Sequence, residues 1–127
     1  MIVVDTSVWV THLRSGNKAL AELLDAAMVL AHPFVIGELA LGNLRERGSI
    51  LSYLEDLPRA AVATHAEVLH FIDRHALFAR GIGYVDTHLL AAVQLTAGAA
   101  LWTFDRRLGR AAEELGLAMP SAKRRAP

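Results

Sequence analysis

The sequence predicts an α/β domain built on a parallel sheet with helices on both faces, because short apolar strands alternate with helical segments along its length. The clearest strand is the β-branched run at residues 2–4, which is typical of a strand buried on both faces and is followed at once by Asp5. A similar apolar run at residues 99–103 leads directly into Phe104 and Asp105.

Apolar residues at helical or strand spacing define the elements of the first half of the chain. The strand that precedes His32 and Pro33 is expected to stop there, because proline suits the first position of a helix. Gly48 is expected to separate two later helices. In order, the segments are a helix carrying Val8, Trp9 and Leu13, a helix at 19–27, a strand at 28–31, a helix from 34 to about 45, a helix at 49–57 and a short strand at 60–63.

Capping residues and glycines divide the second half. Thr64 with Glu67 three residues later is a capping box, which predicts a helix that runs to about residue 79. A glycine-rich connection at 80–83 precedes a helix that is apolar nearly all round, as buried helices are. In order, the remaining segments are that helix at 84–95, the strand at 99–103, a helix at 106–115 and an edge strand at 117–119.

Composition places the chain among ordinary globular domains. Its 127 residues contain no Cys, no internal repeat and no linker, so residues 1–120 are expected to form one domain and residues 121–127 a basic tail. Thirteen basic and 13 acidic residues balance, and the 54% hydrophobic content suggests that some apolar surface faces another chain. Neither a signal peptide nor a membrane span is apparent, so we expect a soluble, cytoplasmic protein.

Four acidic residues are candidates for a shared site. Asp5 and Asp105 each follow a strand, at the sheet edge where ligands of parallel sheets bind, and Asp86 opens a helix. Each Asp alone is well explained as a helix cap worth roughly 1 kcal/mol. Glu38 is not, because it lies within an apolar helix, where a buried carboxylate needs a partner, and Gly42 one turn on would admit a ligand. An exposed helix face or an Arg partner could also explain Glu38.

Together these carboxylates predict a site for a divalent cation. Several carboxylates at one place repel one another, and an all-oxygen ligand set selects Mg²⁺ or Mn²⁺ rather than Zn²⁺. Thr6, Ser7 and Thr103 could orient the carboxylates, although Thr103 could equally be an ordinary strand residue. The six His residues show no ligand spacing and are interpreted as packing or surface residues.

Four segments in register resemble the PIN domain, specifically the VapC toxins of bacterial toxin–antitoxin pairs. They are residues 3–7 (VVDTS), 33–42 (PFVIGELALG), 81–92 (GIGYVDTHLLAA) and 101–108 (LWTFDRRL). The resemblance implies a three-layer α/β/α fold in which the first and fourth strands are adjacent. It also implies a Mg²⁺- or Mn²⁺-dependent endoribonuclease, a homodimer and a VapB-like antitoxin partner.

Carried over by position, the family's acidic quartet falls on Asp5, Glu38, Asp86 and Asp105, and its hydroxyl residue on Thr103. This chain departs from many relatives in having Arg106 and Arg107 where they carry a further acid, which leaves one or two metal ions open. The arginines that could grip an RNA backbone, or pair with antitoxin carboxylates, are Arg45, Arg47, Arg80, Arg106 and Arg107.

Two other functions fit part of the pattern. A phosphoacceptor or phosphatase domain also places an Asp after its first strand, but a receiver wants a well-placed Lys, and Lys18 and Lys123 are not so placed. Phosphatases with an Asp nucleophile want a second Asp at the position of Ser7. A non-catalytic module that binds protein or RNA would suit the high apolar content. Metal binding at the four acids would distinguish the nuclease from this last alternative.

Overall fold

The computed structural model describes residues 1–120, so the predicted basic tail at 121–127 lies outside the described residues. A parallel sheet in the order β2-β1-β3 forms its centre, with β1 at Ile2–Val4, β2 at Val29–Leu30 and β3 at Ala100–Trp102. The first strand therefore lies beside the strand predicted at 99–103, as expected. Because all three strands run the same way, their carboxyl ends meet at one edge of the sheet.

Two of the strands predicted from the sequence, at 60–63 and 117–119, are not formed as strands. The segment at 60–63 is not a strand, since only Arg59 bridges to Ala31, and Ala61 then turns away to donate to the Thr96 hydroxyl at 3.0 Å. The predicted strand at 117–119 is reduced to one bridge between Ala118 and Leu101.

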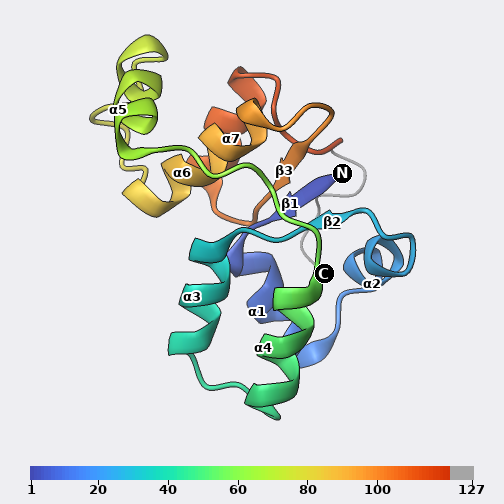
Figure 1. Cartoon of the computed structure of the whole chain (residues 1–127). Coiled ribbons are helices and arrows are strands. Elements are labelled where there is room, and N and C mark those ends of the chain that lie inside the picture. Colours follow the sequence, from blue (N-terminus) through green and yellow to red (C-terminus); the bar gives the residue numbers. More distant parts are fainter. Residues whose placement is uncertain (121–127) are drawn as a thin grey trace.

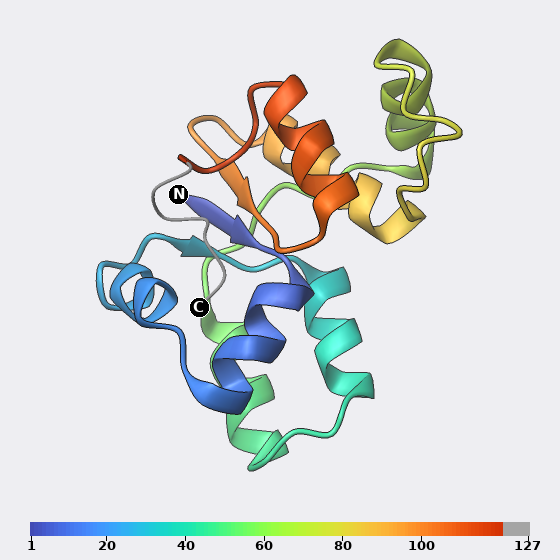
Figure 2. The ribbon, with the colours of Figure 1, turned by 180° about the vertical axis from the view of Figure 1, so that it is seen from behind.

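Helices cover both faces of this sheet, giving the predicted three layers (Figure 1). α6 and α7 cover one face, α1, α3 and α4 lie on the other, and the view from behind shows the same arrangement (Figure 2). α5 packs on α6 and stands outside the layers. The helices are α1 Thr6–Ser15, α2 Lys18–Asp25, α3 Pro33–Leu41, α4 Arg47–Asp56, α5 His65–Arg74, α6 Tyr84–Leu95 and α7 Arg106–Glu114.

Several helix ends differ from the prediction for local reasons. α3 ends at Leu41, so Gly42 lies beyond the helix, and a Cβ there would be 3.4 Å from the Leu39 carbonyl oxygen. Gly42 is therefore the C-cap residue of α3 and not a helical residue one turn beyond Glu38. The break before α4 falls at Glu46, which has a left-handed φ of 49°, rather than at Gly48. α5 ends five residues early, at Arg74.

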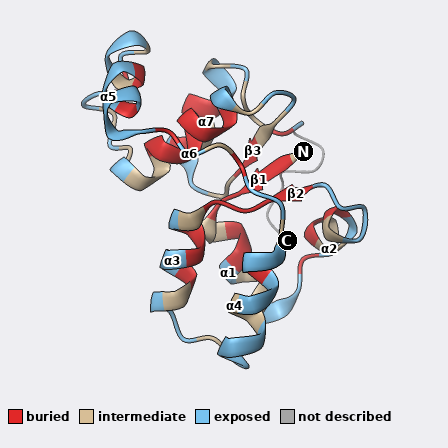
Figure 3. Ribbon diagram, in the orientation of Figure 1, coloured by how far each residue is buried: buried red, intermediate tan, exposed pale blue. Residues whose placement is uncertain are grey.

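The core is continuous from the sheet into α6 (Figure 3). Val3 is fully buried, which confirms that β1 is covered on both faces. Every residue from Thr87 to Val93 is also buried, as its nearly all-apolar sequence predicted. The first turn of α6 is thereby fixed to the sheet, together with the acidic residue that it carries.

Candidate active site

Asp5 and Asp105 lie at the carboxyl edge of the sheet, each directly after a strand. Asp5 is the residue before α1 and is only 4% exposed, whereas Asp105 is the residue before α7 and is exposed. Their strands are neighbours, and the Asp5 N–H donates to the Trp102 carbonyl oxygen at 2.9 Å. The fold thus brings together two carboxylates that are 100 positions apart in the sequence.

Two hydroxyl groups hold the Asp5 carboxylate. Ser7 Oγ and Thr103 Oγ1 both donate to Asp5 Oδ2 at 2.7 Å. Thr103 Oγ1 also accepts the backbone N–H of Asp105 at 3.0 Å, and Ser7 Oγ accepts that of Phe104 at 3.1 Å. Thr103 is therefore more than a β-branched strand residue, because its hydroxyl joins the first and fourth acids. Asp5 Oδ1 has no hydrogen-bond partner within residues 1–120.

Asp86 lies in the first turn of α6 and is half-buried. Burial, followed by the charges of Asp5, Asp105 and Glu38, raises its pKa from 3.8 to about 6. The other three predicted acids therefore lie close enough to Asp86 to disfavour its charged form. Gly83 lines this side of the site, since a Cβ there would be 4.0 Å from Asp86 Oδ2.

Glu38 differs from the prediction in its surroundings. It lies on an exposed part of α3 rather than among apolar side chains, so its charge carries no burial cost. Its Oε1 accepts a hydrogen bond from Thr6 Oγ1 at 2.6 Å, which ties α3 to the start of α1. Of the explanations open for Glu38, the exposed helix face is the one observed, and its charge still acts on Asp86.

Helix capping explains one of the three aspartates. Asp105 Oδ1 accepts the Leu108 N–H at 2.9 Å, as a cap does. Asp5 occupies the same position before α1, yet its side chain makes no cap hydrogen bond. Asp86 is not a cap either, because Gly83 precedes α6. Capping therefore leaves Asp5 and Asp86 without an explanation, and both lie in the group of four.

The donor set suits a hard divalent cation, although the carboxylates do not yet converge on one point. Within residues 1–120, no three His, Asp or Glu side chains are placed so that they could hold one ion together. Mg²⁺ typically keeps several waters and takes only one or two protein carboxylates directly. Asp5 Oδ1 and the Asp86 carboxylate, whose charge is disfavoured by burial, could supply these one or two direct ligands. The residues present therefore fit Mg²⁺ better than an ion that needs a full protein cage.

Buried histidines lie beside the site, where sequence reasoning saw only packing or surface residues. His32 precedes α3, and its Nδ1 accepts the Phe34 N–H at 3.0 Å. Its ring is 6.4 Å from that of His88, and each ring has one buried nitrogen without a partner. Burial, with the neighbouring charges of His88 and Arg59, lowers the pKa of His32 to about 4. No sequence spacing indicated this pair, because it depends on how α3 meets α6.

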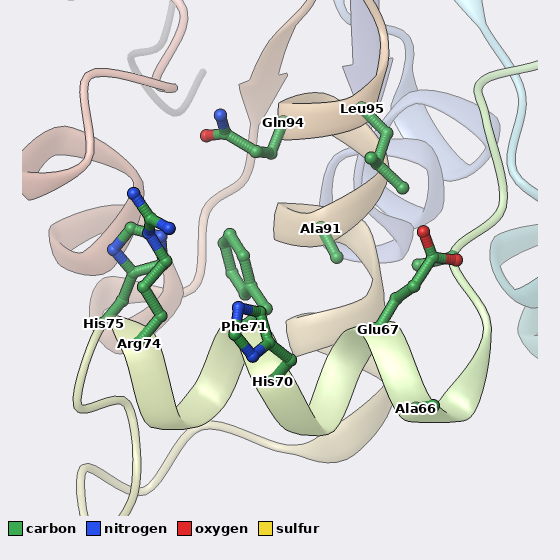
Figure 4. Close-up of a pocket in the computed structure, with 10 residues that line it drawn as sticks. Ala66, Glu67, His70, Phe71, Arg74, His75, Ala91, Gln94 and Leu95 are labelled. Atoms are coloured by element: carbon green, nitrogen blue, oxygen red, sulfur yellow. The ribbon is translucent and has the colours of Figure 1, made fainter.

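A separate hollow of about 640 Å³ lies between α5 and α6 (Figure 4). Phe71, Ala91 and Leu95 provide its apolar surface, and His70 and Arg74 stand on its rim. None of the predicted site residues lines it. Among residues 1–120, no helix is long and apolar enough to cross a membrane.

Comparison with known proteins agrees with this geometry. The PIN domain family model matches residues 2–114. Two relatives named Ribonuclease VapC32, from Mycobacterium tuberculosis strains CDC 1551 / Oshkosh and ATCC 25618 / H37Rv, are each 48% identical over 119 residues, which is 94% of this chain and 96% of the relative. The resemblance to VapC proteins seen in the four segments is therefore confirmed. With its sheet order, its three layers and this match, the chain belongs to the PIN domain family.

Proposed function

We propose that this protein is a metal-dependent endoribonuclease that hydrolyses RNA phosphodiester bonds and acts as the toxin of a type II toxin–antitoxin system. The observation that carries the proposal is the Asp5 carboxylate, which is buried at the sheet edge and held by Ser7 and Thr103 without capping a helix. The name of the two relatives, Ribonuclease VapC32, supports the same activity. Because RNA is the substrate, we place its action in the cytoplasm.

In this proposal Asp5, Glu38, Asp86 and Asp105 would bind Mg²⁺ or Mn²⁺, one or two of them directly and the others through the waters of the ion. The cation would lower the pKa of the attacking water and offset negative charge on the phosphate. The hydroxyls of Ser7 and Thr103 hold Asp5 Oδ2 and leave Oδ1 available as a ligand. The raised pKa of Asp86 means that a proton competes with the cation for this carboxylate, so metal affinity is expected to fall below about pH 6.

A VapB-like antitoxin and a second copy of the chain are the proposed protein partners. Large apolar side chains remain exposed on two parts of the surface. Leu41, at 90% exposure, ends α3, and Tyr53 is exposed on α4, which contacts α3; this region suits an antitoxin segment. Leu69, Phe78 and Leu95 are exposed around α5 and α6 and suit a homodimer contact.

The test is to replace Asp5 by Asn, which keeps the size of the side chain and removes its charge. We expect Asp5→Asn to abolish cleavage of single-stranded RNA in Mg²⁺ or Mn²⁺ while the protein still folds, as judged by circular dichroism. Asp25→Asn, an exposed change at the end of α2, is the matched control and should cleave normally. A chelator should stop cleavage by the wild type, and either ion should restore it.

Cleavage by Asp5→Asn at the wild-type rate would remove the proposal. Failure of Mn²⁺ to bind the wild type would instead favour the non-catalytic binding module.

A further inference from the structure

Two arginines lie between α7 and the connection that leads into α6. Arg80 forms an ion pair with Glu114, with Nη1 2.8 Å from Oε2 and Nη2 donating to Oε1 at 3.1 Å. Arg107, in the first turn of α7, lies over Gly81: a Cβ on this glycine would be 2.5 Å from Arg107 Nη1 and 3.1 Å from Cζ. Gly81 also has a φ of +75°, which disfavours a side chain. A side chain at residue 81 would therefore have to displace the Arg107 guanidinium.

The two arginines differ in how their charge is used. Arg80 is neutralised by Glu114, but Arg107 forms no ion pair within residues 1–120 and is exposed to solvent. Its guanidinium lies against the backbone of the loop at Gly81. The loop limits the positions open to the guanidinium on that side, so it loses less conformational freedom when it binds an anion than a side chain with no neighbour does.

Arg107 is also close to the acidic group without belonging to it. Gly81, which Arg107 covers, is two residues from Gly83, which lies beside Asp86 Oδ2, and two residues span at most about 7 Å. Yet the charges that act on Asp86 are the three other carboxylates, which all raise its pKa, and no arginine counters them. Arg107 therefore lies near the acids, but its positive charge is not among those that act on Asp86.

We propose that Arg107 binds the RNA phosphate next to the one that is cut, and that Gly81 is the residue that positions it. The inference rests on the proposed ribonuclease function. A strand whose cut phosphate lies at the acids must place its neighbouring phosphates nearby, where the carboxylates repel them. Arg107 supplies a cation at that place, and its planar fork matches two phosphate oxygens. It would be a substrate-binding residue, acting on affinity rather than on the chemical step.

RNA binding is measured with the full-length Asp5→Asn protein, which holds the strand without cutting it, using a single-stranded oligonucleotide in Mg²⁺ buffer. Adding Arg107→Ala is expected to raise Kd about tenfold at low salt, as loss of one charged contact does. The slope of log Kd against log salt should fall by about 0.7, the value for one phosphate contact on a single strand. Adding Arg14→Ala instead, at the far end of α1, removes the same charge and should change neither.

The role of Gly81 is tested by comparing Gly81→Ala in the presence and absence of Arg107. Gly81→Ala should weaken RNA binding when Arg107 is present and have little further effect in Arg107→Ala, even if it lowers stability in both. In cleavage assays without the Asp5 change, Arg107→Ala should raise KM and leave kcat within about twofold.

If the wild type cleaves RNA and Arg107→Ala binds it as tightly as Arg14→Ala does, the inference is overturned and the proposed function stands. The same follows if Arg107→Ala keeps its RNA affinity and loses only binding to an acidic antitoxin segment. If the wild type binds RNA through Arg107 but does not cut it, the proposed function is overturned and the binding role is supported.

Discussion

Replacing Asp86 by Asn should make the metal-free protein more stable while abolishing RNA cleavage. In the folded protein, burial and three neighbouring carboxylates raise the pKa of Asp86 from 3.8 to about 6, so its ionised form is disfavoured by folding. Asn has nearly the same shape and no charge. The substitution therefore removes the repulsion without opening a cavity.

The expected gain in stability can be estimated from the pKa shift of Asp86. About two pKa units correspond to a ceiling of about 3 kcal/mol. Asp86 is only half-buried, and solvent screening reduces this considerably. A carboxylate in the first turn of α6 also gains about 0.5 kcal/mol from the helix dipole, which Asn loses. We expect a net gain of about 1 kcal/mol, or about 3–6 °C in Tm.

The direction of the pKa shift determines how the stability of the protein changes with pH. Because the folded pKa lies above the unfolded one, the native state holds its proton more tightly, and the wild type loses stability as the pH rises from about 4 to about 6. The advantage of Asp86→Asn should be absent below pH 4 and complete above pH 6. Thermal melts in a chelator at several pH values measure it. An equal or lower Tm for Asp86→Asn at pH 7.5 would refute the reasoning.

Three further outcomes follow from the site. Thr103→Val should lower cleavage about 10- to 100-fold, because Asp5 loses one of its two hydroxyl donors, while Thr103→Ser should retain most activity; equal rates for the two variants would contradict the role of the hydroxyl. His32 should titrate near pH 4 by NMR, and because its folded pKa lies below 6.5, protein stability should fall as the pH drops from 6.5 toward 4; a normal titration midpoint would show that its ring is not desolvated. Mg²⁺ should raise the Tm of the wild type more than that of Asp86→Asn, and identical shifts would argue against a cation at Asp86.

Much of the fold could be predicted from the local pattern of apolar, polar and glycine residues. The strand at residues 2–4 and the helix at 84–95 were predicted with their correct bounds, because both are apolar all round and have polar or glycine-rich flanks. The capping box at Thr64 and Glu67 is present in the structure, since it involves only neighbouring residues. Features of this kind depend on the local sequence and little else.

Features that depend on tertiary packing were missed. Ala76 and Ala79 favour helix, but both have a left-handed φ, because the chain leaves α5 early and turns to bury Leu77. Likewise, the sequence could not decide whether each Asp caps a helix. Asp105 does, and Asp5 does not, because the hydroxyls of Ser7 and Thr103 hold its carboxylate instead.

The central position of β1 also determines when the protein can become active during its own synthesis. The Asp5 carboxylate is held by the hydroxyl of Thr103, which is made 98 residues later. A nascent chain that already contains β1 therefore lacks β3 and α7 for most of the domain's synthesis. On the proposed function, such an incomplete chain is unable to cleave RNA.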